Sequence, residues 1–469
     1  MTSIVKRFVE ESEKRPSLGL GTASDFITVS EVLGRAATVA RELQSQGIQP
    51  GQKIAMIDSS STGYVVSWLA CLLAGTPVAL INPTYPEELL QEMLAKFEPA
   101  VVWRSEEIAR NRQAVVSEIA GLPGLDSQSL DVISYMHTSG TTGLPKFCAQ
   151  TNNYFIKMAR DMGAALELSP ADRVLAPLPL FHINPMGYGL ITAILAGCDV
   201  FSVEKFSASG FWPVVKENNI SVLILHAPPV EILKRATTTE DAAGHSIRTM
   251  FYANRDFMET FKIPVAVSGY GSTEAGGISH MKKWTSPIGM PDNVSRYGGE
   301  SRPEIEWKLN DAGYVMVRET QDGILFTGYA TADGLNPARD ADGWFDTGDI
   351  GSMESNGDMI FIERGAESIR VKGEYVPIPT LDDRINPISS IVDFAIWKRP
   401  SAVVDDEVVL YIVAEQIPVA EIAQAVADLP KYMQPVAVAR VGTIPRDAAA
   451  GKVQRRLLPD QEVIEWHTM

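Results

Sequence analysis

The chain has 469 residues, of which 45% are hydrophobic and 21% are charged, and its formal net charge is −17. This composition excludes a mainly disordered chain, a collagen and a coiled-coil rod, and the length predicts about three core-sized units. Because the surface is so acidic, we expect neither nucleic acid nor anionic lipid as the main partner, and an anionic ligand must be held by a local site.

Helical and strand-like runs alternate in the first hundred residues. Helices are expected at 29–46, 64–74 and 86–97, and short apolar strands at 53–57, 76–81 and 100–103. The same alternation occurs again later in the chain, with helices expected at 211–218 and 230–235 and strands at 222–225 and 265–267. This alternation predicts βαβ units and a largely parallel sheet.

The sequence pattern changes after Trp307, where turn pairs such as Asp322-Gly323 separate short β-rich runs. This pattern predicts hairpins or a small barrel. The last hundred residues read as an α+β unit, with strands at 394–396, 408–413 and 437–441 and a helix at 419–427. The predicted fold is therefore α/β. Residues 1–364 are expected to form a large N-terminal domain of α/β layers with a β-rich subdomain, and residues 365–469 a small mobile α+β domain.

Cysteines and histidines show no metal or disulfide pattern. Cys71, Cys148 and Cys198 form no CxxC pair, and the six histidines form no HExxH or HxxxH pair. The charged N-terminus lacks the apolar stretch of a signal peptide, and Pro77 interrupts the most apolar region, 64–83. We therefore expect a cytoplasmic protein in a reducing compartment, with no membrane span.

The strongest chemical signal is the run Thr138-Ser139-Gly140-Thr141-Thr142-Gly143-Leu144-Pro145-Lys146, which follows an apolar strand-like segment. Glycines let the backbone turn sharply and aim N–H groups and hydroxyls at phosphate oxygens, and Lys146 adds a cation. The run differs from a Walker A loop, because no Ser or Thr follows the lysine. We interpret it as a phosphate-binding loop of another kind.

Four further motifs follow in chain order: Tyr270-Gly271-Ser272-Thr273-Glu274, then 343–349 ending in Asp349, then Arg364 with Gly373-Glu374, and finally 445–455 with Gly451-Lys452. Together the five motifs resemble those of the adenylate-forming superfamily, which includes acyl-CoA synthetases, luciferases and peptide-synthetase adenylation domains. The resemblance covers essentially the whole chain and implies an AMP-dependent acid ligase of the acyl-CoA synthetase type.

The resemblance implies roles in the activation of a carboxylate by ATP. A carboxylate and the α-phosphate are both anions, so their reaction needs cations and preorganised donors. Lys452 would bridge the two anions, and Glu274 would help to hold Mg²⁺. With these two residues, Thr141 and His182 complete the expected catalytic set. The expected nucleotide-binding residues are Thr138, Ser139, Gly140, Thr142, Gly143, Lys146, Tyr270, Gly271, Ser272, Thr273, Asp349 and Arg364.

Within that set, three residues are expected at the nucleoside. Tyr270 would stack on adenine, Asp349 would accept hydrogen bonds from both ribose hydroxyls, and Arg364 would assist at the ribose. Phe181 and His182 are similar to the family segment that borders the acyl pocket. We interpret His182 as an aromatic gate between the acyl pocket and the thiol tunnel, with no role in proton transfer.

The same segment indicates the class of acid. Amino-acid-activating relatives place an aspartate directly after this Phe, whereas this chain has His182 there. The flanking residues 183–189 carry no charge, and the opposite wall, expected at 225–229 and 275–278, offers only His226 as a polar anchor. These features predict an acid without an α-ammonium group, either aliphatic or aryl. The glycines of the two walls are expected to leave space for it: Gly187, Gly189, Gly276 and Gly277.

The chain departs from the family pattern in three places. It is short between Trp103 and Asp131, and 249–263 lacks the small-Gly-Gly-Ala-Pro stretch that lies against adenine in relatives. The residue at the crossover hinge, usually Asp or Lys, is Ala366. Rotation between two half-reaction conformers is still expected about this point, because a hinge needs only to absorb a change in φ and ψ.

The leading prediction is adenylation of a small carboxylic acid to acyl-AMP and pyrophosphate, followed by acyl transfer to coenzyme A. ATP and Mg²⁺ would be the cofactors and coenzyme A the co-substrate. Alternative acceptors are an acyl or peptidyl carrier protein acting in trans, or an amine or other small nucleophile in a specialised biosynthetic pathway. A catalytically dead nucleotide-binding module is a hypothesis of another class. The presence of both Lys452 and Glu274 disfavours it.

Overall fold

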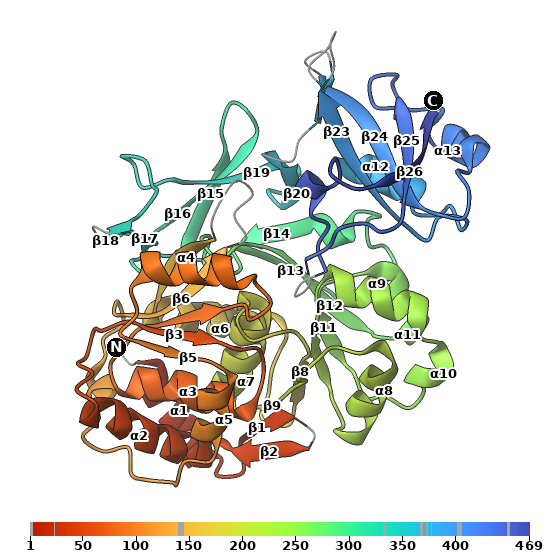
Figure 1. The fold of residues 1–469 in the computed structure, drawn as a ribbon. Helices are drawn as coiled ribbons and strands as arrows, with labels where there is room; N and C mark the ends of the chain where they lie inside the picture. Colours follow the sequence, from red (N-terminus) through yellow and green to blue (C-terminus); the bar gives the residue numbers. More distant parts are fainter. Residues whose placement is uncertain are drawn as a thin grey trace. The chain divides into compact units, whose positions relative to one another are not determined.

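The computed structural model describes residues 3–22, 24–138, 145–331, 334–365, 369–371, 374–376, 378–400, 406–447 and 451–469 (Figure 1). The chain divides into two compact units. The N-terminal unit comprises Met1–Lys308, Met316–Thr347 and Met353–Ile360, and the C-terminal unit comprises Leu309–Val315, Gly348–Ser352 and Phe361–Met469. The division cuts four strands, β15 (Ile305–Leu309), β16 (Tyr314–Glu319), β19 (Phe345–Met353) and β20 (Met359–Arg364), so each unit holds part of the β-rich segment.

Seven strands form the smaller sheet of the N-terminal unit, in the order β18-β17-β7-β6-β4-β3-β5. They are β3 (Ile54–Ile57), β4 (Val78–Ile81), β5 (Val101–Trp103), β6 (Val132–Thr138), β7 (Lys146–Thr151), β17 (Gly328–Thr331) and β18 (Gly334–Asn336). The helices of this region are α2 (Val29–Ser45), α3 (Thr62–Leu73), α4 (Glu87–Phe97) and α5 (Ser105–Arg112). Strands β3 to β6 run parallel, which confirms the predicted βαβ units.

Helices cover both faces of this sheet (Figure 1). Phe97 of α4 packs on one face with Ala55 and Ile57 of β3. On the opposite face, the indole N–H of Trp68 in α3 donates to Ser134 Oγ of β6 at 3.0 Å. Successive side chains of a strand point to opposite faces, so burial on both sides explains why these strands are apolar throughout.

The larger sheet has the strand order β15-β16-β19-β20-β14-β13-β12-β11-β10-β8-β9-β1-β2. Its other strands are β1 (Gly19–Thr22), β2 (Asp25–Thr28), β8 (Arg173–Ala176), β9 (Asp199–Ser202), β10 (Val222–Ile224), β11 (Thr249–Phe251), β12 (Val265–Tyr270), β13 (His280–Trp284) and β14 (Tyr297–Ser301). The six strands from β12 to β1 are parallel, and β2, β13 and β14 are antiparallel additions.

Both faces of the larger sheet are also covered. Leu175 of β8 joins an apolar cluster with α8 (Ala208–Glu217), α9 (Ala227–Ala236) and α11 (Arg255–Phe261). Its neighbour Ala176 faces the other way, toward the π-helix η2 (Asn184–Ile191), and a Cβ added at Gly189 of η2 would lie 2.5 Å from Ala176 Cβ. The remaining helices of this unit are α1 (Ile4–Lys14), η1 (Pro123–Asp126), α6 (Asn152–Ala165), α7 (Thr192–Leu195), α10 (Thr239–Ala242) and η3 (Val294–Arg296).

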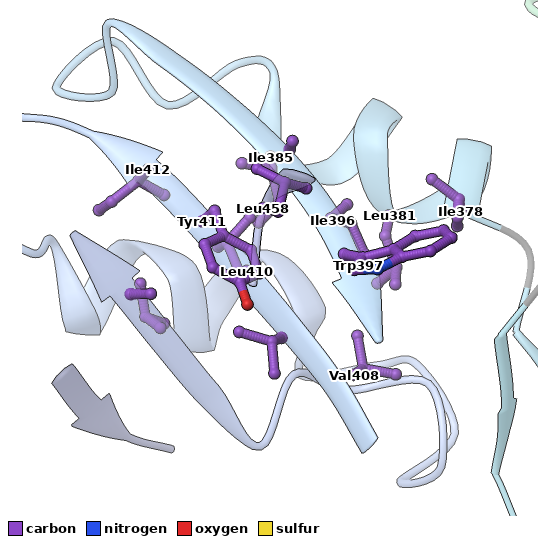
Figure 2. Close-up of a cluster of buried hydrophobic side chains, with 14 of the residues drawn as sticks. Ile378, Leu381, Ile385, Ile396, Trp397, Val408, Leu410, Tyr411, Ile412 and Leu458 are labelled. Atoms are coloured by element: carbon purple, nitrogen blue, oxygen red, sulfur yellow. The ribbon is translucent and has the colours of Figure 1, made fainter. Parts of the chain in front are cut away.

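The C-terminal unit is an α+β body with its own core, as predicted. A four-stranded sheet runs in the order β23 (Asp393–Pro400), β24 (Asp406–Val413), β25 (Ala437–Val441) and β26 (Val463–Thr468). The other elements are the hairpin β21 (Ile369–Val371) and β22 (Glu374–Val376), and the helices α12 (Ile378–Ile385), α13 (Val419–Val426) and η5 (Arg455–Leu457). In the core, Leu381 and Ile385 of α12 cluster with Ile396 and Leu410 of the sheet (Figure 2).

The three cysteines are fully buried as free thiols in the N-terminal unit. Burial raises the pKa of the Cys71 and Cys148 thiols above the usual range and raises that of Cys198 to about 12. In the part of the chain that the structure describes, no helix combines the length and the apolar character that a membrane crossing requires.

An ion pair with a buried carboxylate fixes the start of β8 and predicts an acid-sensitive stability. Arg248 donates from Nε and Nη2 to the two carboxylate oxygens of Asp172, each at 2.7 Å, and Ser221 Oγ donates to Asp172 Oδ1 at 2.8 Å. Burial alone raises the pKa of Asp172, but these hydrogen bonds outweigh burial and lower it from 3.8 to about 2. The carboxylate therefore stabilises the fold above about pH 4, and this stabilisation is lost as the pH falls toward 2.

We expect Asp172→Asn to lower the free energy of unfolding by about 1.5–3 kcal/mol at neutral pH, because hydrogen bonds to a charged group are lost. The difference from the parent should shrink between pH 4 and pH 2. Denaturant titrations at several pH values measure it. Asp292→Asn is the control, since its side chain is 94% exposed beside Arg255 and such surface pairs contribute little. A difference at Asp172 that stays constant down to pH 2 would contradict the ion-pair explanation.

Candidate active site

The predicted phosphate loop connects β6 and β7, which pair antiparallel up to Thr138 and Lys146. Both ends of the loop are therefore fixed by a strand ladder. Thr138 lies at the carboxyl end of a parallel strand, which is the edge where open α/β sheets bind ligands. Five of the predicted phosphate-loop residues lie outside the described residues: Ser139, Gly140, Thr141, Thr142 and Gly143.

Lys146, Tyr329 and Glu274 form a contiguous group. The Lys146 ammonium lies 4.7 Å from the centroid of the Tyr329 ring, and the Tyr329 hydroxyl donates to Glu274 Oε1 at 3.0 Å. Both interactions orient a charged group. The structure thus brings a predicted phosphate ligand and the predicted Mg²⁺ ligand together. Tyr329, which links them from β17, was not singled out by any sequence motif.

Buried tyrosines fix the backbone of the segment 273–278, which follows the Tyr-Gly-Ser motif and carries Glu274. The hydroxyl of Tyr154 donates to the Thr273 carbonyl at 2.9 Å, and that of Tyr188 donates to the Gly277 carbonyl at 2.6 Å. Burial raises the pKa of both tyrosines, so both remain donors at neutral pH. This fixed backbone holds the carboxylate of the motif in place before any ligand arrives.

A buried arginine holds the other side of this segment. Arg302 Nη1 donates to the carbonyls of Gly276 and Ile278, each at 3.0 Å, while Arg302 Nε pairs with Asp161 at 2.6 Å. The Arg302 side chain is fully buried, so loss of Asp161 would leave an uncompensated charge in the interior. Sequence reasoning missed Arg302, because its partners lie far away along the chain.

The residues that begin the motif have defined local roles. A Cβ at Gly271 would lie 2.3 Å from the Gly277 carbonyl oxygen, so only glycine fits this close approach. Ser272 Oγ accepts from the Ala275 amide at 3.2 Å, and the Ser272 carbonyl accepts from the Gly277 amide at 3.0 Å. Tyr270 is buried at the end of β12, and its adenine contact stays a prediction.

An aromatic cluster adjoins the phosphate loop. The rings of Phe181 and His182 lie 4.5 Å apart, and His137, the residue before the loop, lies 6.4 Å from His182. The Asn82 amide donates to His137 Nε2 at 3.3 Å, which assigns a neutral imidazole with its proton on Nδ1, 3.2 Å from the Tyr85 hydroxyl. The gate role of His182 stays a prediction, and His137 is a neighbour that the motifs did not reveal.

The segments predicted to wall the acyl pocket lie together. Helix η2 begins two residues after His182, and Asn184 Nδ2 donates to the Leu225 carbonyl at 3.1 Å. Tyr188, also on η2, bonds to Gly277 as described above, and its ring lies 5.1 Å from Phe251. Contacts of η2 therefore connect it to both segments of the predicted opposite wall.

The expectation that the four glycines of these walls leave space for the acid is wrong. A Cβ added at any of them would lie within 3.0 Å of a neighbouring atom: Met158 beside Gly187 and Gly277, Ala176 beside Gly189, and the Ile324 carbonyl beside Gly276. The missing side chains allow neighbours to approach the backbone closely and do not open a cavity.

Tyr252 lies in the segment where the family pattern has a small-Gly-Gly-Ala-Pro stretch, and its backbone has a left-handed φ of +78°. A non-glycine residue in this backbone conformation costs about 1–3 kcal/mol, and it persists only where its surroundings hold it. The Tyr252 amide donates to the Val267 carbonyl at 3.0 Å, and its ring stacks on His226 with centroids 5.7 Å apart. Burial raises the pKa of Tyr252 to about 12. The segment that lacks the family's glycines therefore carries an aromatic pair, and its relation to adenine stays a prediction.

In the C-terminal unit, the two predicted ribose residues are direct partners. Arg364 Nε donates to Asp349 Oδ1 at 2.8 Å. The Asp349 side chain is only 5% exposed, whereas that of Arg364 is 39% exposed. The ion pair fixes the orientation of the buried carboxylate. Its contact with a ribose stays a prediction.

Lys452 is exposed in the part of the lysine loop that the structure describes, residues 445–447 and 451–455. The Asp447 amide donates to the Lys452 carbonyl at 2.7 Å, and Arg446 Nη1 donates to the Gly451 carbonyl at 3.0 Å. Arg446 also pairs with Asp393 of β23 at 2.7 Å, which ties the loop to the sheet. These contacts therefore support the backbone at Lys452 itself.

The predicted Mg²⁺ site rests on a single carboxylate. Among the described residues, no group of three or more His, Cys, Asp or Glu side chains is placed to hold a metal ion. Mg²⁺ commonly binds through one or two carboxylates together with substrate phosphates, so Glu274 on its fixed segment fits such a site.

The chain is similar to known proteins over most of its length. The family described as AMP-binding enzyme matches residues 5–334. The chain is 28% identical over 451 residues to "4-coumarate--CoA ligase 3" of Oryza sativa subsp. japonica, an alignment that covers 85% of this chain and 80% of that protein. It is 24% identical over 464 residues to "2-succinylbenzoate--CoA ligase" of Oceanobacillus iheyensis, covering 92% and 94% of the two chains.

Solved structures share the fold over nearly the full length. The o-succinylbenzoate CoA synthetase (MenE) from Bacillus subtilis, in complex with the acyl-adenylate intermediate OSB-AMP, has a TM-score of 0.85 at 19% identity, covering 98% of this chain and 99% of that chain. ATP-bound MatB from Rhodopseudomonas palustris has a TM-score of 0.79 at 20% identity, with the same coverage.

Proposed function

The chain belongs to the AMP-binding enzyme family, and from this premise we propose that it is an AMP-forming acid–CoA ligase. It activates a carboxylic acid with ATP and passes the acyl group to coenzyme A. The observation that carries this proposal is the Lys146–Tyr329–Glu274 group on a fixed backbone segment. The curated relatives described above support the choice of coenzyme A, because both are described as CoA ligases.

In the first half-reaction, a carboxylate oxygen attacks the α-phosphorus of ATP and the bond to pyrophosphate breaks. Lys146, with Thr138 and Thr273, holds the phosphates, and Lys452 neutralises the anions that must meet. Mg²⁺, when bound at Glu274, would screen the charge of the leaving pyrophosphate. In the second half-reaction, the sulfur of coenzyme A attacks the acyl carbon and AMP leaves. The proton of the coenzyme A thiol is released to solvent.

The acid is a carboxylate without an α-ammonium group. Position 182 holds a histidine where an aspartate would be needed, and His226 is the sole polar anchor of the opposite wall. An ammonium buried there without a partner would cost several kcal/mol. Apolar chains or rings gain about 25 cal/mol per Å² on burial, which favours aliphatic or aryl acids.

Acid-dependent pyrophosphate release tests the proposal. A panel of aliphatic, aryl and amino acids is assayed with ATP and Mg²⁺, with and without coenzyme A, and the products are identified by mass spectrometry. We expect acyl-CoA from a non-amino acid. Release that needs a carrier protein or an amine would reassign the acceptor. A preference for an α-amino acid over its des-amino analogue would overturn the interpretation of position 182.

Asp349→Ala is expected to raise the KM for ATP by about 10–150-fold with a smaller effect on kcat. Charge-assisted hydrogen bonds to ribose hydroxyls are worth roughly 1.5–3 kcal/mol, and they form equally in the ground and transition states. Steady-state kinetics in ATP measure the split. Asp346→Ala is the matched control, because Asp346 is an exposed aspartate of the same strand. Equal use of 2′-deoxy-ATP and ATP by the parent would contradict the ribose role.

A further inference from the structure

Met158 lies between the two predicted walls of the acyl pocket. It is fully buried on α6. A Cβ at Gly187 of η2 would lie 2.4 Å from Met158 Cε, and a Cβ at Gly277 of the opposite wall would lie 2.4 Å from Met158 Sδ. One thioether therefore packs directly on the backbone of both walls, at two positions where any larger residue would collide with it.

We propose that Met158 sets the upper size of the acid that this enzyme accepts, by closing the apolar end of the acyl pocket between Gly187 and Gly277. The inference rests on the proposed function and on its assignment of these two walls. No sequence motif contains Met158, and its role emerges only from the packing of α6 against the two glycines.

The surroundings of the thioether are held in place, so removing it leaves room that cannot simply collapse. Gly277 is fixed through its carbonyl by Tyr188, and its φ of +75° belongs to the left-handed region. Gly187 is fixed on η2, where its carbonyl accepts from Thr192 Oγ1 at 2.8 Å. A rigid apolar site of this kind remains as a cavity after truncation, and such cavities bind apolar groups.

The consequence for specificity follows from the size of the lost group. Met158→Ala removes the sulfur and two carbons, and each methylene accommodated in a hydrophobic pocket changes kcat/KM by about 10–200-fold. The ratio of kcat/KM for a longer acid to that for the best acid of the parent should therefore rise at least tenfold. The neighbouring side chain of Ile183, whose Cγ1 would lie 3.2 Å from a Cβ at Gly277, stays in place.

The test compares Met158→Ala and the milder Met158→Val with Met162→Ala. Met162 is a fully buried methionine one turn further along α6, so its truncation controls for loss of stability without opening the space between the two glycines. Linear acids of increasing length and para-extended aryl acids are assayed by pyrophosphate release. Acid-induced shifts in melting temperature in the presence of ATP give the same comparison without turnover.

We expect both Met158 variants to move the preference toward larger acids, whereas Met162→Ala keeps the parental ratios. Parental ratios in both Met158 variants, or the same change in Met162→Ala, would overturn the proposal. Failure of the proposed function looks different. In that case the parent releases no pyrophosphate with any acid, while the size limit is still read from the melting-temperature shifts.

Discussion

Lys452→Ala is expected to slow formation of the acyl-adenylate by about 10²–10³-fold, or about 3–4 kcal/mol in activation free energy. Removal of one preorganised charge-stabilising group commonly has an effect of this size. Lys452 is exposed, and its loop is held by backbone hydrogen bonds and by the Arg446–Asp393 pair, so the melting temperature should not change. Acid-dependent pyrophosphate release measures the loss.

The same substitution should spare the second half-reaction, in which presynthesised acyl-adenylate is converted to thioester. The lysine assists the meeting of carboxylate and α-phosphate, and that step is already complete in the adenylate. Lys431→Ala, an exposed lysine of the same unit, controls for loss of surface charge. Equal loss of both half-reactions would indicate a structural role for Lys452.

Glu274→Gln is expected to lower the rate of adenylation by about 10²-fold at fixed Mg²⁺ and to raise the Mg²⁺ concentration needed for half-maximal rate. A metal ion supplies several kcal/mol of stabilisation to developing phosphate charge, and a neutral amide holds it less well than a carboxylate. Glutamine keeps the size of the side chain and can still accept from Tyr329, so the fixed segment should persist. Titration of the rate with Mg²⁺ measures the change.

Tyr329→Phe is the matched comparison for this carboxylate. It removes the hydrogen bond to Glu274 but keeps an aromatic face for the Lys146 ammonium. Tyr329→Phe keeps the negative charge of the Glu274 carboxylate and removes only one hydrogen bond that orients it, so a smaller loss than in Glu274→Gln is expected. A Mg²⁺ requirement unchanged in both variants would remove Glu274 from the metal site.

The layered fold was predictable because its helices and strands are encoded by local periodicity. The structure has α2, β3, β4 and α4 within a few residues of the expected ranges. The candidate site residues could be proposed from the sequence for another reason, since each belongs to a contiguous motif, and their roles stay predictions. Residues that act across the fold were not. Arg302, Tyr154 and Tyr188 contact the segment 273–278 from positions between 24 and 119 residues away.

The glycines show a second limit of sequence reasoning. The sequence shows that position 187 is a glycine and has no side chain. It does not show which neighbour fills the space. That neighbour is Met158, 29 residues earlier on another helix. Tyr252 shows the converse, because its left-handed backbone marks a glycine-like position that the residue type conceals. Both outcomes are decided by tertiary packing, which overrides what the residue alone suggests.

The burial of all three cysteines has a practical consequence for measuring acyl transfer. Native Cys71, Cys148 and Cys198 are shielded, and their thiols stay protonated at neutral pH, so a disulfide-forming colour reagent should not consume them. The thiol of coenzyme A would then be the only reactive one in the cuvette, and its disappearance would report each thioester formed. Addition of denaturant to the same sample would unmask the protein thiols and count the enzyme present.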